Sequence, residues 1–309
     1  MKLTTLLFNL LLAVVGSSLV IHAQTLSNED EILRNLRLRA TEGNFVSQYE
    51  LAHFLLHQAS KQRRDPIEAA KWLHYSAEQN HPNAPYLLYR LYQRGLGVPK
   101  DEKKALYWLM KAAENHEKMA EYDLACRYMN GDGVPVDEQE AVRWLTRSAK
   151  DLHVEAAYQL ACRYEKGQGV SQSQDEAFKW FLHAASGGHG MARYRLSQAY
   201  ETGKGMPKNP GKAVVSLMEA AESGVPEAQL KIGLFYLNDH VMPQDNEQAL
   251  RWLLVYELSM PRDLQVREHI VKARANLSIK QQTDAQSWAT STHFQIELRK
   301  NLYLPLELD

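Results

Sequence analysis

The spacing of tryptophan constrains the fold of this chain more than any other feature. Its six tryptophans lie at intervals of 36 residues or a multiple of 36, and the one vacant position in the series is Ser216. They are Trp72, Trp108, Trp144, Trp180, Trp252 and Trp288. Alanine recurs at the same interval at Ala84, Ala120, Ala156, Ala192 and Ala228. A fixed period of this length indicates a repeat protein whose similar units stack in a row.

Each unit has the pattern of two antiparallel helices. In the second unit, Ala84, Leu88 and Tyr92 recur every four residues, which predicts a first helix over residues 83–94 with one apolar stripe. Gly95 can adopt the left-handed conformation that ends a helix, and Asp101 can cap the start of a second helix. The equivalent cap positions are Asp65, Asp137, Ser173, Asn209 and Asp245. The sequence therefore predicts an all-α solenoid of helix pairs, with the indoles packed inside it.

The ends of the chain depart from the period. Residues 1–23 contain Lys2, an apolar run and a small residue at Ala23, which is the pattern of a secretory signal peptide. An uncleaved anchor is the alternative, but Asn9 and Ser17 interrupt the run. Residues 24–43 are predicted to form an N-terminal capping helix that starts at Ser27, and residues 44–257 six repeats. Residues 258–296 are predicted as a degenerate repeat that keeps only its second helix, and residues 297–309 as an irregular tail.

The composition excludes several classes of protein. The 36 basic and 37 acidic residues give a net charge of −1, so no strongly basic field would draw the chain onto nucleic acid. Two cysteines are too few for a disulfide scaffold. They lie at equivalent positions of neighbouring repeats, Cys126 and Cys162, where the distance between packed helices is too large for a disulfide. After removal of the signal peptide, no segment is apolar enough to span a membrane.

No catalytic or metal-binding motif stands out. G-x-S-x-G, phosphate-binding and H-E-x-x-H patterns are absent from the sequence. His53 and His57 are four residues apart and can share one helix face, but the sequence indicates no third metal ligand. His81, His153 and His189 recur between repeats, either as a pH-sensing series or as ordinary loop residues. We therefore expect no catalytic residue, no bound metal and no cofactor.

The first helices offer a candidate binding surface. On each of them, the arc opposite the apolar stripe contains positions 87, 90, 91 and 94 and their equivalents. This arc carries Arg90, Arg94, Arg127, Arg163 and Arg195, and its edge carries Tyr86, Tyr122, Tyr158 and Tyr194. Arginine and tyrosine are residue types that anchor protein interfaces. In the alternative interpretation, the tyrosines pack between repeats and the arginines form a solvated face.

The repeat pattern resembles that of a known family. Residues 120–149 carry Ala120, Leu124, Tyr128, the Gly131 and Gly133 pair, Val134, Pro135, Asp137, Ala141, Trp144 and Ala149. This pattern resembles the Sel-1-like repeat family, relatives of the tetratricopeptide repeat, over about residues 44–257 with a degenerate extension to about 296. The resemblance implies a right-handed superhelix with the first helices on its concave face. It also implies a non-catalytic scaffold.

The resemblance leads to a functional expectation. Exported bacterial members of the family are implicated in envelope assembly, signalling or contact with host cells. We therefore expect a periplasmic or secreted scaffold that binds a protein or peptide, and the basic row suits a partner with exposed acidic groups. One alternative is a cell-wall carbohydrate or peptidoglycan binder that uses the tyrosines. A β-lactam-interacting hydrolase ranks last, because this chain lacks the cysteine pairing of the family branch linked with that activity.

Overall fold

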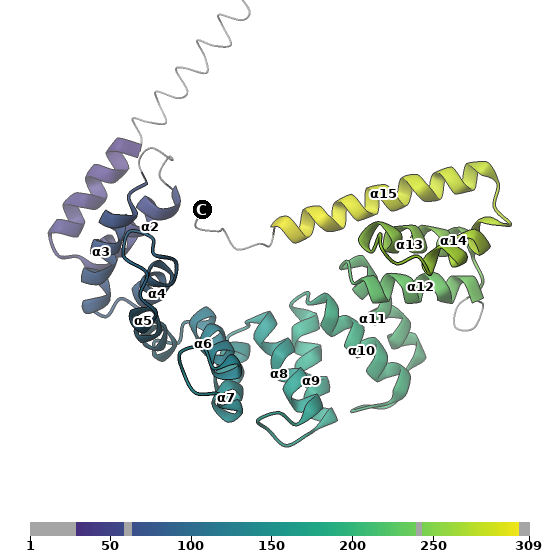
Figure 1. Cartoon of the computed structure of the whole chain (residues 1–309), viewed down its shortest axis with the longest axis horizontal. Helices are drawn as coiled ribbons and strands as arrows, with labels where there is room; N and C mark the ends of the chain where they lie inside the picture. The colour runs from purple at the N-terminus through teal and green to yellow at the C-terminus, as the bar shows by residue number, and fades with distance from the viewer. Residues whose placement is uncertain (1–28, 59–63, 239–242, 303–309) are drawn as a thin grey trace, which may run out of the picture. The chain divides into compact units, whose positions relative to one another are not determined.

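The structure, a computed structural model, describes residues 29–58, 64–238 and 243–302 (Figure 1). Over these ranges the regular secondary structure is helical, without a β-strand, and the helices pack in adjacent pairs, so the all-α prediction is confirmed. The predicted signal peptide lies outside the described residues. The chain divides into two compact units, with the boundary between Ala120 and Glu121.

The first described element of the first unit is a helix over residues 29–41, within the range predicted for the capping helix. The predicted start of that helix at Ser27 lies outside the described residues, and Gly43 follows its end with a φ of +89°. The elements after it are α2 (Phe45–His53), the π-helix η1 (Phe54–Gln58), α3 (Pro66–Glu78), α4 (Ala84–Arg94) and α5 (Glu102–Glu114).

The second unit contains the remaining helices. It starts within α6 (Lys118–Asn130). The helices that follow are α7 (Glu138–Lys150), α8 (Val154–Lys166), α9 (Gln174–Ser186), α10 (Gly190–Thr202), α11 (Pro210–Glu222), α12 (Pro226–Asn238), α13 (Asn246–Ser259), α14 (Val266–Arg274) and α15 (Ile279–Leu302). No helix among the described residues combines the length and the apolar character that crossing a membrane requires.

The helix boundaries follow from local capping chemistry. All six predicted N-cap side chains accept a hydrogen bond from a backbone N–H of the first helical turn, which satisfies a donor that the helix itself leaves unpaired. Gly95, Gly167 and Gly203 end the first helices α4, α8 and α10 in the left-handed conformation. Both signals are visible in the sequence because they depend on residues close together in the chain.

A first helix packs on two second helices at several places in the chain. In the second unit, α8 contacts α7 and α9, and α10 contacts α9 and α11. In the first unit α4 likewise contacts α3 and α5, so that Leu87 and Leu91 are buried there. The helical pattern predicts that these two positions face outward. That prediction is wrong for α4, because a helix held between two neighbours buries a wider arc than one apolar stripe.

The periodic tryptophans are only partly inside the core. Trp144 and Trp252 are buried, whereas the indoles of the other four are half-buried. An indole is large enough that part of it usually remains at the surface. The buried positions are filled mainly by alanine and leucine, for example Leu88, Leu124 and Leu160.

The C-terminal region holds more helix than predicted. The sequence pattern predicts that the seventh unit keeps only its second helix, yet α14 supplies a first helix as well. Residues 297–302, predicted to belong to an irregular tail, continue α15. The rest of the predicted tail, residues 303–309, lies outside the described residues.

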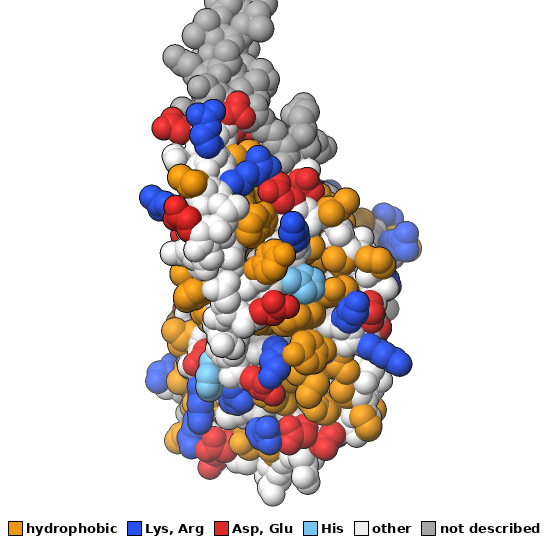
Figure 2. Space-filling model, turned by 90° about the vertical axis from the view of Figure 1, so that its left-hand side faces the viewer, with side chains coloured by type: hydrophobic (Ala, Val, Ile, Leu, Met, Phe, Trp, Pro, Cys, Tyr) orange, Lys and Arg blue, Asp and Glu red, His pale blue; other side chains and the backbone are white. Residues whose placement is uncertain are grey.

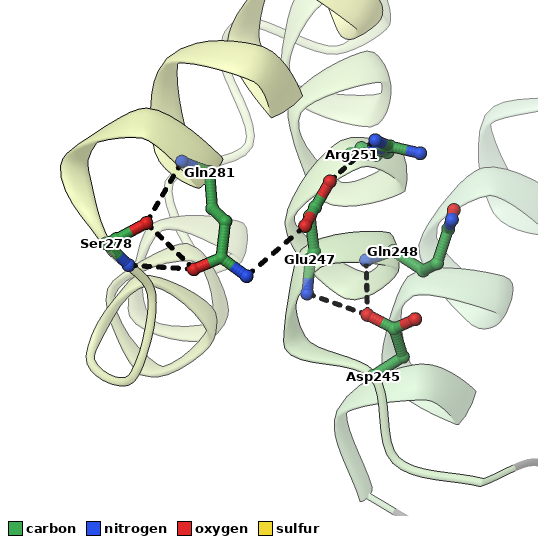
Figure 3. A network of polar contacts seen from close by, with 6 residues as sticks. All are labelled: Asp245, Glu247, Gln248, Arg251, Ser278 and Gln281. Carbon is green, nitrogen blue, oxygen red and sulfur yellow. Dashed lines mark hydrogen bonds and ion pairs between the residues drawn. The ribbon is translucent and has the colours of Figure 1, made fainter.

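Polar contacts join α15 to the last full repeat (Figure 3). Ser278, the predicted cap, accepts a hydrogen bond from the backbone N–H of Gln281. The Gln281 amide donates to Glu247 on α13 at 3.4 Å, and Glu247 is paired with Arg251 at 2.6 Å. Trp288 packs edge-on against Trp252, with 5.3 Å between the ring centroids. The helix thus covers the side of α13 that a further repeat would otherwise cover.

Candidate binding surface

Arg127, at the end of α6, is part of the fold. Arg127 is only 6% exposed, and its Nη1 donates a hydrogen bond to the backbone oxygen of Asp132 at 3.2 Å. The side chain thereby ties the end of the helix to the loop that follows. Arg127 is at the position equivalent to Leu91, which explains why it is buried rather than offered to a partner.

Arg163 on α8 is engaged with a neighbouring helix. Its Nη1 forms an ion pair with Glu138 at the start of α7, and only 13% of its side chain is exposed. This burial lowers the pKa of the Arg163 guanidinium. The ion pair joins α8 to the second helix of the preceding repeat, so the guanidinium is already in use within the protein.

The guanidinium of Arg195 on α10 is less fully engaged in contacts within the protein than those of Arg127 and Arg163. Its Nη1 is 3.4 Å from the Gln198 side-chain oxygen, a long hydrogen bond, and Tyr158 contributes to its electrostatic environment. Its Nε is buried without a hydrogen-bond partner among the described residues. Burial works against the charge, but Glu165 and Tyr158 outweigh it and raise the pKa of Arg195. The guanidinium therefore stays charged and retains a donor.

A cavity of about 350 Å³ opens beside Arg195. On α10 it is lined by Arg195, Gln198, Ala199 and Thr202, which are equivalent to positions 87, 90, 91 and 94 of the predicted open arc. The α9 side chains that line it include Phe178 and Phe181. In this repeat the open arc thus borders a concave site with both apolar and charged walls.

Arg90 and Arg94 belong to the first unit. Arg90 on α4 is half-buried, and its charge helps to lower the pKa of His57. Arg94 is exposed in the last turn of the same helix. Burial is the main cause of the His57 shift, which brings its pKa to about 4. Arg90 thus lies in the electrostatic environment of a neutral imidazole.

Two members of the tyrosine row lie at contacts between repeats. Tyr122 stacks on His153 with 4.7 Å between ring centroids, and Tyr158 stacks on His189 at 4.2 Å. Tyr86 packs near Tyr89, with the two ring centroids 5.7 Å apart. Tyr194 is the fourth member and packs against the core of the last repeats. One ring face of both Tyr122 and Tyr158 is therefore covered within the protein.

Two of the three recurring histidines, His153 and His189, act as helix caps, a role that the sequence analysis missed. Nδ1 of His153 accepts a hydrogen bond from the backbone N–H of Ala156, and Nδ1 of His189 accepts one from Ala192, both at 3.1 Å. The Nε2 of His189 is 3.0 Å from a carboxylate oxygen of Glu155. An accepting Nδ1 requires the tautomer with its proton on Nε2. The sequence did contain a signal for this role, because Glu117 occupies the position equivalent to His153 and is a hydrogen-bond acceptor. Its side chain accepts a hydrogen bond from the backbone N–H of Ala120 in the first turn of α6.

The groups considered for chemistry are a histidine pair and two cysteines. The rings of His53 and His57 lie 4.6 Å apart, but the described residues contain no group of three metal-ligating side chains. Cys126 and Cys162 are free thiols, and burial raises the pKa of both. A raised pKa leaves little thiolate at neutral pH, so neither thiol is activated as a nucleophile.

Charge is mixed on the face of the molecule that Figure 2 shows. Lysine and arginine side chains alternate there with aspartate and glutamate, and hydrophobic side chains lie between them. This mixture agrees with the near-zero net charge of the chain. The described side chains on this face therefore present no field of one sign.

Comparisons with solved structures identify similar folds. A Sel1 repeat protein from Oxalobacter formigenes is 28% identical, with 70% of this chain and 89% of that chain covered and a TM-score of 0.59. A protective antigen present in uropathogenic Escherichia coli strains, displaying an SLR fold, is 22% identical, with 89% and 75% covered and a TM-score of 0.38. An immunity protein from Pseudomonas aeruginosa is 17% identical, with 82% of each chain covered and a TM-score of 0.39.

The Sel1 repeat family matches the sequence in six places. The matched residues are 46–81, 90–116, 118–151, 154–189, 190–215 and 226–254. A search of curated proteins found no significant match. Since the six repeats together cover more than half of its length, the chain belongs to the Sel1 repeat family.

Proposed function

We propose that this chain is an exported scaffold that binds a protein or peptide partner in the bacterial envelope through the first helices of its second unit. Sel1 repeat proteins are generally non-catalytic scaffolds, and their repeats mediate protein interactions. The observation that carries the proposal is the cavity beside Arg195, because four positions of the predicted open arc line it.

Export is supported by the first 23 residues. They combine Lys2, a long apolar run and a small residue at Ala23, which is the pattern that signal peptidase substrates share. The solved relatives reported above come from bacteria. If the chain is exported, its partner lies in the periplasm or outside the cell.

The proposed surface is narrower than the arginine row predicted from the sequence. Arg127 and Arg163 are engaged in contacts within the fold, which leaves Arg195 as the arginine beside the cavity. Lys204 is exposed at the same cavity, and Lys231 of α12 borders it. This placement favours a partner that brings carboxylates to the surface of α10.

A protein or peptide partner fits the site better than a carbohydrate. Carbohydrate binding of the kind considered above would use open tyrosine faces, but Tyr122 and Tyr158 each have one face covered by histidine. The cavity walls instead combine phenylalanine with charged and amide side chains. Such walls suit an apolar side chain flanked by polar groups.

Charge reversal at the cavity tests this function. The variant Arg195→Glu with Lys204→Glu is expected to lose partner capture from an envelope fraction, because it repels carboxylates where the wild type attracts them. The matched control is Arg143→Glu with Lys179→Glu, since both residues are exposed on second helices and the change in charge is the same. Capture is measured by quantitative mass spectrometry, after circular dichroism has shown that both variants are folded.

Two outcomes decide the test. A protein captured by the wild type and the control, but lost from the cavity variant, supports binding at the first helices. Equal capture by all three proteins, or loss in the control alone, contradicts it.

A further inference from the structure

A second cavity adjoins the first. It has a volume of about 110 Å³ and lies among α10, α11 and α12. Glu201 and Lys231 line both cavities, and their ion pair of 2.5 Å stands at the boundary between them. The two hollows are therefore parts of one groove across consecutive repeats of the second unit.

The two cavities are built from the same positions, one repeat apart. Residues that line the first cavity recur 36 positions later in the second. A cation occupies the same position in both, Arg195 in the first cavity and Lys231 in the second. Glu165 and Glu201 are the equivalent acidic residues, and Phe178 and Val214 are equivalent apolar residues of the walls. The groove is thus a tandem site whose spacing is the spacing of the repeats.

One of the positions at which the two copies differ bears directly on their size. Ala199 lines the first cavity, and its equivalent in the second is Phe235. The phenylalanine fills space that alanine leaves open, which agrees with the volumes of 350 and 110 Å³. The Lys231 ammonium lies 5.5 Å from the centre of the Phe235 ring. The larger cavity has room for an aromatic side chain, and the smaller one suits an aliphatic side chain.

The preceding junction is filled by the protein itself. There the residue equivalent to Ala199 is Arg163, and the residue equivalent to Gln174 is Glu138. These two side chains form an ion pair in that place. The tandem site therefore starts at the junction of α8, α9 and α10.

Three cations, Arg195, Lys204 and Lys231, line the first cavity together with two carboxylates, Glu165 and Glu201, and this excess of positive charge favours an acidic ligand there. Glu201 is paired with Lys231, whereas the buried Nε of Arg195 has no hydrogen-bond partner among the described residues. A buried donor without a partner is costly, and a carboxylate can accept two hydrogen bonds from one guanidinium. Lys204 adds an exposed positive charge at the same cavity.

We propose that these two cavities are consecutive subsites for an extended peptide segment of the partner protein. An aromatic side chain enters the larger cavity, a neighbouring carboxylate binds Arg195, and an aliphatic side chain enters the smaller cavity. The segment passes over the Glu201–Lys231 ion pair. This assignment rests on the proposed function, since it specifies which part of a protein partner the first helices recognise.

Selection from a display library of short random peptides tests the assignment. The full chain, without its signal peptide, is the bait. Enriched sequences are expected to combine an aromatic residue next to aspartate or glutamate with an aliphatic residue at a fixed distance. No enrichment, or enrichment of a motif without the acidic and aromatic pair, overturns the proposal.

Variants then place the selected peptide on the groove. Ala199→Phe installs the residue that the next repeat carries at this position, and it is expected to weaken binding of a fluorescein-labelled peptide at least about tenfold by filling the larger cavity. Arg195→Met is expected to weaken binding of the acidic peptide by about tenfold, because the guanidinium that holds the carboxylate is lost. The same variant is expected to bind the peptide whose acid is replaced by the amide with almost unchanged affinity.

Matched controls are available on α9 itself. Leu182→Phe and Lys179→Met alter exposed residues that do not line either cavity, and both are expected to leave peptide affinity unchanged. Unchanged affinity in Ala199→Phe, or equal losses for the acidic and amide peptides in Arg195→Met, overturns the assignment. If the full partner still requires the α10 surface in the charge-reversal test, only this assignment fails and the proposed function stands.

Discussion

Replacing Arg147 by alanine is expected to destabilise the second unit by about 3–5 kcal/mol, because it removes the cation that faces a buried carboxylate. Glu121 at the start of α6 is 0% exposed. Its Oε1 lies 2.9 Å from the Nε of Arg147 on α7. Transfer of a carboxylate from water into the protein interior is costly unless an opposite charge accompanies it. Arg147 provides that charge, and its guanidinium also lies 4.4 Å from the centre of the Trp144 ring.

Arg143 provides the matched control on the same helix. It also faces a glutamate, Glu140 at 3.0 Å, and lies 5.4 Å from the Trp144 ring centre. Its side chain is 62% exposed, so water replaces the lost ion pair and Arg143→Ala is expected to cost less than about 1 kcal/mol. The two free energies of unfolding are measured by urea denaturation followed by circular dichroism.

A second variant separates the charge from the packing. If the loss in Arg147→Ala comes from the buried carboxylate, the further change Glu121→Gln should recover part of it, because the amide is cheaper to bury than the ion. Similar losses in Arg147→Ala and Arg143→Ala would contradict this account. So would the absence of any recovery in the double variant.

Replacing Gly169 by alanine is expected to cost about 3–5 kcal/mol, through two separate effects. The residue has a φ of +71°, a conformation that costs a residue with a Cβ about 1–2 kcal/mol. An added Cβ would also lie 2.1 Å from the backbone oxygen of Glu138, at the start of α7. Backbone cannot move aside as a flexible side chain can, so the repeats must separate locally.

The same close approach recurs along the chain. A Cβ on Gly97 would lie 2.0 Å from the oxygen of Pro66, and one on Gly205 would lie 2.4 Å from the oxygen of Gln174. At Gly97, Gly169 and Gly205, the second glycine of the pair is thus the point where a loop touches the first turn of the preceding second helix. Its role is to let neighbouring repeats approach each other.

Gly188→Ala is the control for the conformational part. Its φ is +92°, and no atom lies within 4 Å of the place that an added Cβ would take, so only the backbone cost of about 1–2 kcal/mol is expected. Urea denaturation of both variants gives the difference. Equal losses would show that the contact with Glu138 contributes nothing.

Local signals account for what could be predicted from the sequence. Asp137 caps α7 and Gly167 ends α8 as expected, because caps and left-handed glycines depend on a few neighbouring residues. Gly169 recurs 36 residues after Gly133, so the preference for glycine at this position is visible in the sequence. The physical cause of this preference is not visible in the sequence, because an added Cβ would meet the backbone of Glu138 in the preceding repeat.

Contacts between repeats account for most of what was missed. The sequence pattern places Arg163 on an open face, but its ion pair with Glu138 of the preceding repeat engages it within the fold. Glu138 holds Arg163, whereas Gln174 occupies the equivalent place beside α10. The helix α14 was missed because residues 258–277 carry neither a tryptophan nor a glycine pair of the repeat.

Site-specific photocrosslinking tests most directly whether this chain binds a partner at the first helices of its second unit. A photoreactive amino acid replaces Gln198, which lines the larger cavity, or Leu182, which is 48% exposed on α9 and lines neither cavity. The protein is then irradiated in cells that naturally produce it. We predict a discrete crosslinked protein from position 198 and none from position 182. Crosslinks from position 182 alone, or the same products from both positions, would contradict binding at this surface.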